Sequence, residues 1–126
     1  MICGKVLVIE DNPMNTELAT DLLEAAGFQV LTADLAEDGI ALAVTQQPDI
    51  ILMDIALPGV DGLEATRRIK RDARTSWIPI VALTASVMAG DDDMARAAGC
   101  CGYIVKPIDT RHFAETVAAI LKREKP

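Results

Sequence analysis

Apolar residues along this chain recur with two different periods, which predict strands and helices in turn. Short and nearly continuous apolar runs such as Ile50–Met53 are typical of strands buried on both faces. Apolar residues spaced three and four apart, such as Leu18, Leu22 and Leu23, indicate helices with one buried face. The predicted strands are Lys5–Glu10, Phe28–Thr32, Ile50–Met53, Ile78–Thr84 and Cys101–Val105. The predicted helices are 13–26, 35–46, 62–74, 91–99 and 110–123.

A helix follows every predicted strand, and this order is typical of an α/β fold. Right-handed crossovers then produce a parallel five-stranded sheet with helices on both faces. The strand Phe28–Thr32 is the least apolar, which suits a sheet edge. We therefore expect the strand order 2-1-3-4-5 of flavodoxin-like folds, with the first strand beside the third. No repeat, linker or low-complexity segment interrupts the sequence, so residues 1–126 are expected to form a single domain.

Composition and charge narrow the classes of function. The 12 Lys and Arg against 19 Asp and Glu give a net charge of −7, which disfavours a nucleic-acid partner. No apolar run is long enough for membrane insertion, and Met1–Lys5 lacks the features of a signal peptide. The cysteines are odd in number, without disulfide-framework or zinc-site spacing: Cys3, Cys100 and Cys101. We expect a cytoplasmic protein with free thiols.

Polar side chains stand at the carboxyl ends of the predicted strands: Glu10 and Asp11 after the first, Asp54 after the third, Thr84 at the end of the fourth and Lys106 after the fifth. Parallel sheets bind ligands in the crevice outside these ends, so all five side chains should face one crevice. Converging carboxylates repel one another, and Mg2+ with its preference for oxygen ligands would relieve that repulsion. A hydroxyl and an ammonium group suit a phosphate on the same ion, and a carboxylate nucleophile beside them makes an aspartyl phosphate plausible.

This pattern resembles the receiver domains of bacterial response regulators in two-component signalling, over essentially the whole chain. The strings that carry the resemblance are V-I-E-D-N-P-M-N, I-L-M-D-I-A-L-P-G-V-D-G and G-Y-I-V-K-P-I. They are most similar to stand-alone receivers of the DivK type, and receivers attached to hybrid histidine kinases carry similar strings. The resemblance implies a receiver fold and a single-domain response regulator of a phosphorelay, a signalling protein that catalyses only its own phosphorylation and dephosphorylation.

The resemblance also implies the chemistry of the phosphoacceptor. Asp54 would take a phosphoryl group from a phosphohistidine on a histidine kinase or a histidine phosphotransfer protein. Mg2+ would be held by three carboxylates and one backbone carbonyl: Glu10, Asp11, Asp54 and the carbonyl of Ala56.

Further residues would bind the phosphoryl group or change conformation when it is bound. Thr84 and Lys106 would bind the phosphoryl group, and Ala85 would leave room for the phosphodonor. Tyr103 matches an aromatic switch that turns inward when Thr84 moves, although an ordinary aromatic at the edge of a core is the alternative. The Lys106–Pro107 bond is expected to be cis. A chain of this length leaves no room for a DNA-binding domain, so the fourth helix, fifth strand and fifth helix would bind a downstream protein.

The same residues bear on three other classes of function. A flavodoxin-like cofactor binder needs a glycine- and hydroxyl-rich phosphate loop where Glu10 and Asp11 stand. A phosphatase of the haloacid-dehalogenase type needs a second aspartate where Ala56 stands, and its nucleophile follows the first strand. A receiver domain cut from a hybrid sensor histidine kinase stays open, and so does a receiver-like interaction module that works without phosphorylation.

Overall fold

A computed structural model of the chain describes residues 4–57, 61–84 and 91–124. Its strands are β1 (Gly4–Ile9), β2 (Phe28–Ala33), β3 (Ile50–Asp54), β4 (Ile80–Thr84) and β5 (Gly102–Val105). Its helices are α1 (Pro13–Ala25), α2 (Ala36–Gln46), α3 (Gly62–Arg71), α4 (Asp91–Ala98) and α5 (Phe113–Glu124). The predicted alternation of strands and helices is confirmed, and the described helices include none long and apolar enough to span a membrane.

The sheet is parallel throughout, with the predicted order β2-β1-β3-β4-β5. Its register matters for function because it sets which residues meet at the carboxyl edge. Ile9 of β1 pairs with Met53 of β3, so the next residues, Glu10 and Asp54, emerge side by side. Asp54 pairs in turn with Leu83 of β4, which brings the end of β4 to the same edge.

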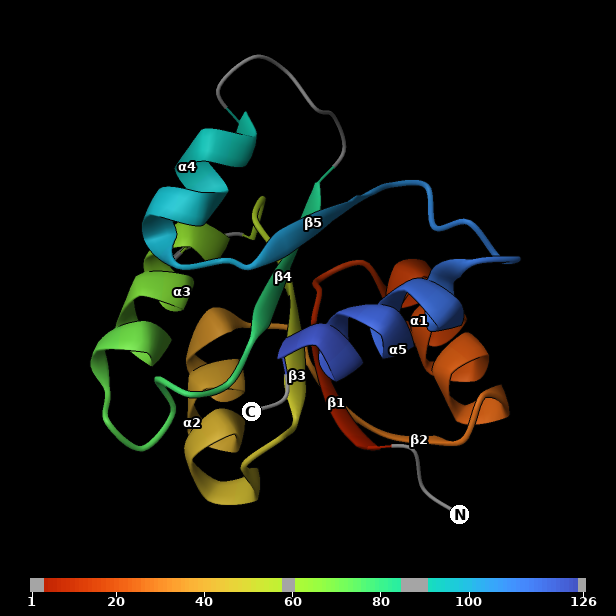
Figure 1. The fold of residues 1–126 in the computed structure, drawn as a ribbon, viewed down its shortest axis with the longest axis horizontal. Helices are drawn as coiled ribbons and strands as arrows, with labels where there is room; N and C mark the ends of the chain where they lie inside the picture. The colour runs from red at the N-terminus through yellow and green to blue at the C-terminus, as the bar shows by residue number, and fades with distance from the viewer. Residues whose placement is uncertain (1–3, 58–60, 85–90, 125–126) are drawn as a thin grey trace.

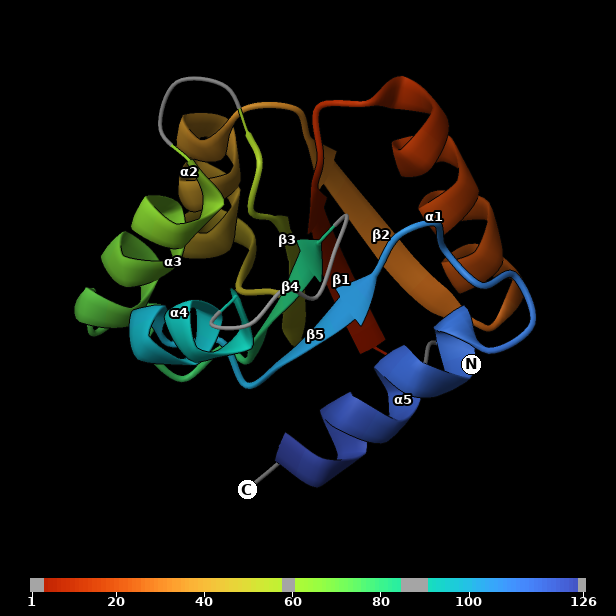
Figure 2. The same cartoon turned by 90° about the horizontal axis from the view of Figure 1, so that it is seen from above.

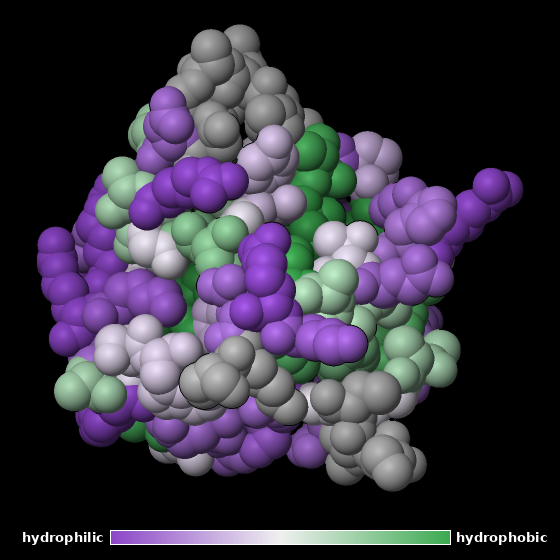
Figure 3. All heavy atoms as spheres, in the orientation of Figure 1, coloured by the Kyte–Doolittle hydropathy of each residue, from purple (hydrophilic) through white to green (hydrophobic). Residues whose placement is uncertain are grey.

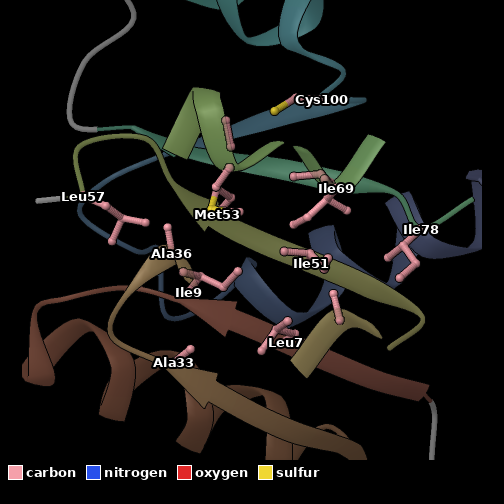
Figure 4. Close-up of a cluster of buried hydrophobic side chains, with 14 of the residues drawn as sticks. Leu7, Ile9, Ala33, Ala36, Ile51, Met53, Leu57, Ile69, Ile78 and Cys100 are labelled. Carbon is pink, nitrogen blue, oxygen red and sulfur yellow. The ribbon is translucent and has the colours of Figure 1, made fainter. Parts of the chain in front are cut away.

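Helices cover both faces of the sheet, with α2, α3 and α4 on one face and α1 and α5 on the other (Figures 1 and 2). Alternate residues of β1 belong to two hydrophobic cores on opposite faces of the sheet. Leu7 and Ile9 point toward α2 and α3, whereas Val6 and Val8 point toward α1 and α5. Figure 4 shows the first of these cores. The two-sided burial explains why β1, β3 and β4 read as almost unbroken apolar runs.

Helix α3 ends at Arg71, three residues before the predicted end. Asp72 is extended at ψ 122°, and the Thr75 hydroxyl donates a hydrogen bond of 2.7 Å to the carbonyl of Ile69 in the last turn. Hydroxyl side chains that bond to backbone carbonyls compete with continued helix, which accounts for the early stop. The other element boundaries differ from the prediction by at most three residues.

Lys70 of α3 anchors the loop that leads to β4. Its ammonium group donates hydrogen bonds to the carbonyls of Ser76 at 3.1 Å and Ile78 at 2.5 Å. The stem of Lys70 passes so close to Gly99 that a Cβ added there would lie 2.7 Å from the Lys70 Cγ, and Gly99 also has a φ of +119°. Burial lowers the pKa of Lys70.

Gly62 gives the start of α3 room to lie over the end of β3. A Cβ built on Gly62 would contact the carbonyl oxygen of Asp54 and lie 2.6 Å from the Cα of Ile55. Both neighbours are backbone atoms beside the candidate site, so neither moves aside without distorting the end of the strand. The close approach of α3 therefore requires glycine at this position.

We predict that Gly62→Ala lowers the free energy of unfolding by about 1–3 kcal/mol, because the added methyl group overpacks rigid backbone. Urea denaturation followed by circular dichroism measures the change. Gly102→Ala is the matched control, since its Cβ would meet nothing closer than the Arg123 guanidinium at 3.9 Å. Equal stability of the two variants would contradict the argument.

Candidate functional site

Three carboxylates meet where β1 and β3 end. Glu10 and Asp54 are each only 2% exposed, whereas Asp11 is exposed. One ligand oxygen from each of the three lies within 4.8 Å of the others. The sheet brings them together because β1 and β3 are hydrogen-bonded neighbours although 44 residues separate Glu10 from Asp54. The predicted acidic crevice is therefore present.

Lys106 reaches the same crevice from the end of β5. Its ammonium nitrogen lies 2.8 Å from Oε1 of Glu10 and 3.2 Å from Oδ2 of Asp54. The backbone N–H of Lys106 donates to the carbonyl of Thr84 at 2.7 Å, which fixes where the chain leaves the sheet. The following bond to Pro107 is cis, the isomer that the family resemblance implies. One lysine thus bridges two buried carboxylates.

The remaining predicted residues differ in how closely the structure ties them to this centre. The backbone N–H of Ala56 donates to Oδ1 of Asp54 at 2.9 Å and so orients the carboxylate. Thr84 is 7% exposed at the end of β4, and Tyr103 on β5 is 38% exposed. Ala85 lies outside the described residues, so its expected role has no structural counterpart here.

Charge is distributed unequally over the buried groups. Burial raises the pKa of Glu10, and the neighbouring Asp54 raises it further. Burial also favours a higher pKa for Asp54, but the neighbouring Glu10, the hydrogen bond from the Ala56 N–H and the Lys106 charge together hold its pKa below the ordinary value. Burial opposes the charge on Lys106, yet the pKa of Lys106 is raised because both carboxylates favour the ammonium form. Asp54 is therefore the carboxyl group of the pair that ionises more readily.

The donor set fits a hard divalent cation. Oε2 of Glu10 is buried and has no hydrogen-bond partner within the described part of the chain. A buried carboxylate oxygen without a partner is costly, and an ion with oxygen ligands would satisfy it. Carboxylates that leave room for water and phosphate oxygens are the ligands that Mg2+ prefers. The residues present thus suit Mg2+.

Asn15 is a site residue that the sequence analysis missed. Its side-chain N–H donates a hydrogen bond of 2.8 Å to Oε1 of Glu10, the oxygen that also pairs with Lys106. The only sequence signal was its place in the first turn of α1, directly after the acidic pair. A surface groove of about 600 Å3 opens on the same side, between α1 and the residues that join β2 to α2. Its lining is acidic and hydroxyl-rich: Glu10, Asp11, Thr16, Glu17, Thr20, Asp21, Thr32, Asp34 and Asp38, together with Pro13 and Ala33.

Two aromatic side chains lie away from the crevice. The Trp77 indole N–H donates to Gln47 Oε1 at 3.1 Å and to the Arg74 carbonyl at 3.2 Å, at the amino end of β4 and the far end of the sheet. His112 is exposed and pairs with Asp109 at 2.9 Å in the turn before α5. Neither residue contacts the acidic crevice.

The fold and the site together define a class of protein. The chain matches the response regulator receiver domain family over residues 6–118, and it belongs to that family. Members of this family act in two-component signalling, with histidine kinases as partners and downstream proteins as targets. Receiver domains bind Mg2+ at an acidic pocket, and the Glu10–Asp11–Asp54 cluster is its counterpart here.

Individual relatives refine this result. The chain is 42% identical to the polar-differentiation response regulator DivK of Brucella ovis, over 92% of this chain and 94% of DivK. Among solved structures, the receiver domain of a sensor histidine kinase from Pseudomonas aeruginosa has a TM-score of 0.83 at 33% identity, covering 95% of each chain. That structure has a magnesium ion coordinated in its active-site cleft. Chemotaxis protein CheY4 of Vibrio cholerae has a TM-score of 0.85 at 26% identity, over 97% of this chain and 98% of CheY4.

We predict that Glu10→Gln stabilises the metal-free protein at pH 7. The raised pKa of Glu10 means that its charge is disfavoured in the folded state. The resulting loss of folding stability is absent below the ordinary pKa of 4.5 and grows as pH rises above it, because Glu10 then ionises more readily in the unfolded chain. We expect Tm to rise by a few degrees at pH 7, which corresponds to about 1 kcal/mol, and the gain to shrink as pH falls toward 4.5.

Thermal denaturation in the presence of a chelator, between pH 4.5 and 8, measures this effect. The exposed Glu17 on α1 provides the control, because Glu17→Gln should change stability by no more than about 0.5 kcal/mol at any pH. A loss of stability in Glu10→Gln at pH 7 would show that Lys106 more than compensates the buried charge.

Proposed function

We propose that this chain is a single-domain response regulator that accepts a phosphoryl group on Asp54 in a Mg2+-dependent reaction. The observation that carries the proposal is the buried Asp54, which lies 3.2 Å from the Lys106 ammonium within a cluster of three carboxylates. This combination provides a nucleophile, a positive charge for phosphate oxygens and ligands for a cation at one strand edge. We assign the metal to Glu10, Asp11, Asp54 and the carbonyl of Ala56.

The proposed transfer is a displacement at phosphorus. A carboxylate oxygen of Asp54 forms the new P–O bond, and the P–N bond of the phosphohistidine breaks. The electron pair of that bond goes to the imidazole nitrogen, which takes up a proton from solvent water. The lowered pKa of Asp54 keeps the nucleophile ionised. A Mg2+ ion held by Glu10, Asp11 and Asp54 would supply positive charge beside the phosphoryl oxygens.

The protein groups around Asp54 would then reorganise. In the unphosphorylated protein Lys106 pairs with Glu10 and Asp54. We propose that Lys106 turns to a phosphoryl oxygen once phosphorylation removes the negative charge of the Asp54 carboxylate. The Thr84 hydroxyl would donate to a second phosphoryl oxygen. Thr84 stands at the end of the fully buried β4, so a shift there would be transmitted to the neighbouring β5.

The surface formed by α4, β5 and α5 is the proposed binding site for a downstream protein. Figure 3 shows hydrophobic atoms at the surface around β5, between α4 and α5, on a face that is otherwise largely hydrophilic. Exposed apolar and aromatic side chains lie there: Met94 at 55%, Tyr103 at 38% and Val105 at 40%. We propose that Tyr103 turns inward when Thr84 moves, which would change this surface and bias a two-state equilibrium.

Two observations bear on whether the receiver works alone. DivK of Brucella ovis is itself named a response regulator, and the similarity extends over 94% of its length, which supports a stand-alone regulator. The Pseudomonas receiver is part of a sensor histidine kinase, so a hybrid kinase is the second candidate source of this domain. Phosphorylation of Asp54 is proposed in either setting.

We predict that incubation with acetyl phosphate and Mg2+ raises the intact mass by one phosphoryl group. Asp54→Asn should abolish the increase, because the amide is not a nucleophile at phosphorus. Asp61→Asn is the control, since Asp61 caps α3 through the Glu64 N–H and asparagine caps equally well. Labelling of Asp54→Asn as strong as that of the wild type would refute the assignment.

We also predict that Asp11→Asn weakens Mg2+ binding by about 10-fold or more, because one anionic ligand is lost while the buried pair stays intact. Isothermal titration calorimetry is the suitable measurement. Trp77 lies at the far end of the sheet, so its fluorescence is not expected to report on this site. An unchanged affinity would remove Asp11 from the metal site.

A further inference from the structure

The first turn of α1 brings an amide against the buried carboxylate of Glu10. Pro13 begins the helix, and the Asn12 side chain caps it by accepting from the N–H groups of Met14 at 2.9 Å and Asn15 at 3.4 Å. Asn15 is the third residue of this helix, and its side-chain nitrogen lies 2.8 Å from Oε1 of Glu10. The start of α1 therefore sets where the amide meets the carboxylate.

The two oxygens of Glu10 have different surroundings. Oε1 accepts from both Asn15 and Lys106, whereas Oε2 is buried without a partner in the described part of the chain. The terminal torsion of a glutamate is soft, so nothing within the side chain itself fixes which oxygen faces the acidic cluster. Donors that engage one oxygen hold the plane of the carboxylate and leave the other oxygen available.

The two donors differ in charge, and this difference decides their roles. Lys106 carries a positive charge, which repels a cation. In the proposed function Lys106 leaves Glu10 and binds the phosphoryl group. Asn15 is neutral, so it holds Glu10 without opposing a divalent ion. Without Lys106, the Asn15 bond is the remaining hydrogen bond to Oε1 that the described residues provide.

We propose that Asn15 is a positioning residue for Mg2+, whose amide holds Oε1 of Glu10 so that Oε2 serves the metal. This inference rests on the proposed function, because it assumes that Glu10 is a metal ligand. It adds a residue that the acidic cluster itself does not contain. Outer groups that orient a ligand typically contribute about 10- to 100-fold to metal affinity.

A purely structural role for Asn15 makes a different prediction. The cap of α1 is provided by Asn12, and asparagine is a poorer helix former than alanine. Asn15→Ala should therefore leave Tm unchanged or slightly higher if the side chain serves only the helix. Loss of Mg2+ affinity out of proportion to any loss of stability is the signature of positioning.

The test measures Mg2+ binding by calorimetry on metal-free wild type, Asn15→Ala, Met14→Ala and Asn12→Ala. We expect Asn15→Ala to bind Mg2+ about 10-fold more weakly, with Tm lowered by no more than in Asn12→Ala. Met14 is 78% exposed on the same turn, so Met14→Ala should stay within about 2-fold of the wild type. Asn12→Ala removes the cap and should lower Tm with a smaller effect on Mg2+ affinity.

Phosphorylation by acetyl phosphate gives an independent readout. In Asn15→Ala the Mg2+ concentration for half-maximal rate should rise about 10-fold, while the rate at saturating Mg2+ stays within about 2-fold of the wild type. A positioning residue that acts through the metal is rescued by excess metal, whereas a residue that touches the phosphoryl group is not.

Each outcome supports or overturns the inference. Mg2+ affinity of Asn15→Ala equal to the wild type overturns it, and so does an equal loss in Asn12→Ala, which would assign the effect to the helix start. If the wild type takes up phosphate and Mg2+ while Asn15→Ala behaves identically, only the role of Asn15 fails. If the wild type neither binds Mg2+ nor becomes labelled, the proposed function fails and the inference with it.

Discussion

Two buried carboxylates held by one lysine are the interaction on which the arrangement of this molecule depends. Glu10 and Asp54 lie almost fully buried, and Lys106 bridges them at 2.8 and 3.2 Å. Burying two like charges is unfavourable unless a cation and hydrogen bonds accompany them. The parallel sheet meets that condition by bringing the end of β5 to the same edge as the ends of β1 and β3.

The same pair links stability to ligand binding. The folded state raises the pKa of Glu10 and leaves Oε2 of Glu10 without a hydrogen bond in the described residues, so this edge is not optimised for the metal-free protein. A divalent ion would satisfy that oxygen and would stabilise the folded state by mass action. The Asn15 amide holds Oε1 in the metal-free state and so reduces the rearrangement that the ion would require.

The elements around the site differ in how tightly they are packed. β1, β3 and β4 are buried on both faces, which fixes the positions of Glu10, Asp54 and Thr84. α4 is the shortest described helix, and among its described side chains the buried ones are the small Ala95 and Ala98. Small anchors provide little packing energy, so we infer that α4 and the adjoining β5 are displaced more easily than the doubly buried strands. This gradient suits the proposed change of the surface formed by α4, β5 and α5.

The sequence by itself determined the alternation of elements, the strand order and the polar residues at the strand ends, including Asp54 and Lys106. The alternation and the strand-end residues have strong local signals, because doubly buried strands require unbroken apolar runs and a polar residue is tolerated only where the strand emerges. The strand order has no local signal and followed from the fold class that the alternation indicates. Only the tertiary structure decided that α3 stops at Arg71, that the Lys70 ammonium holds the loop before β4, and that Asn15 reaches Glu10. Each of these three features depends on which side chains meet in space and on the direction in which a single donor points. The period of apolar residues along the chain encodes neither the meeting nor the direction.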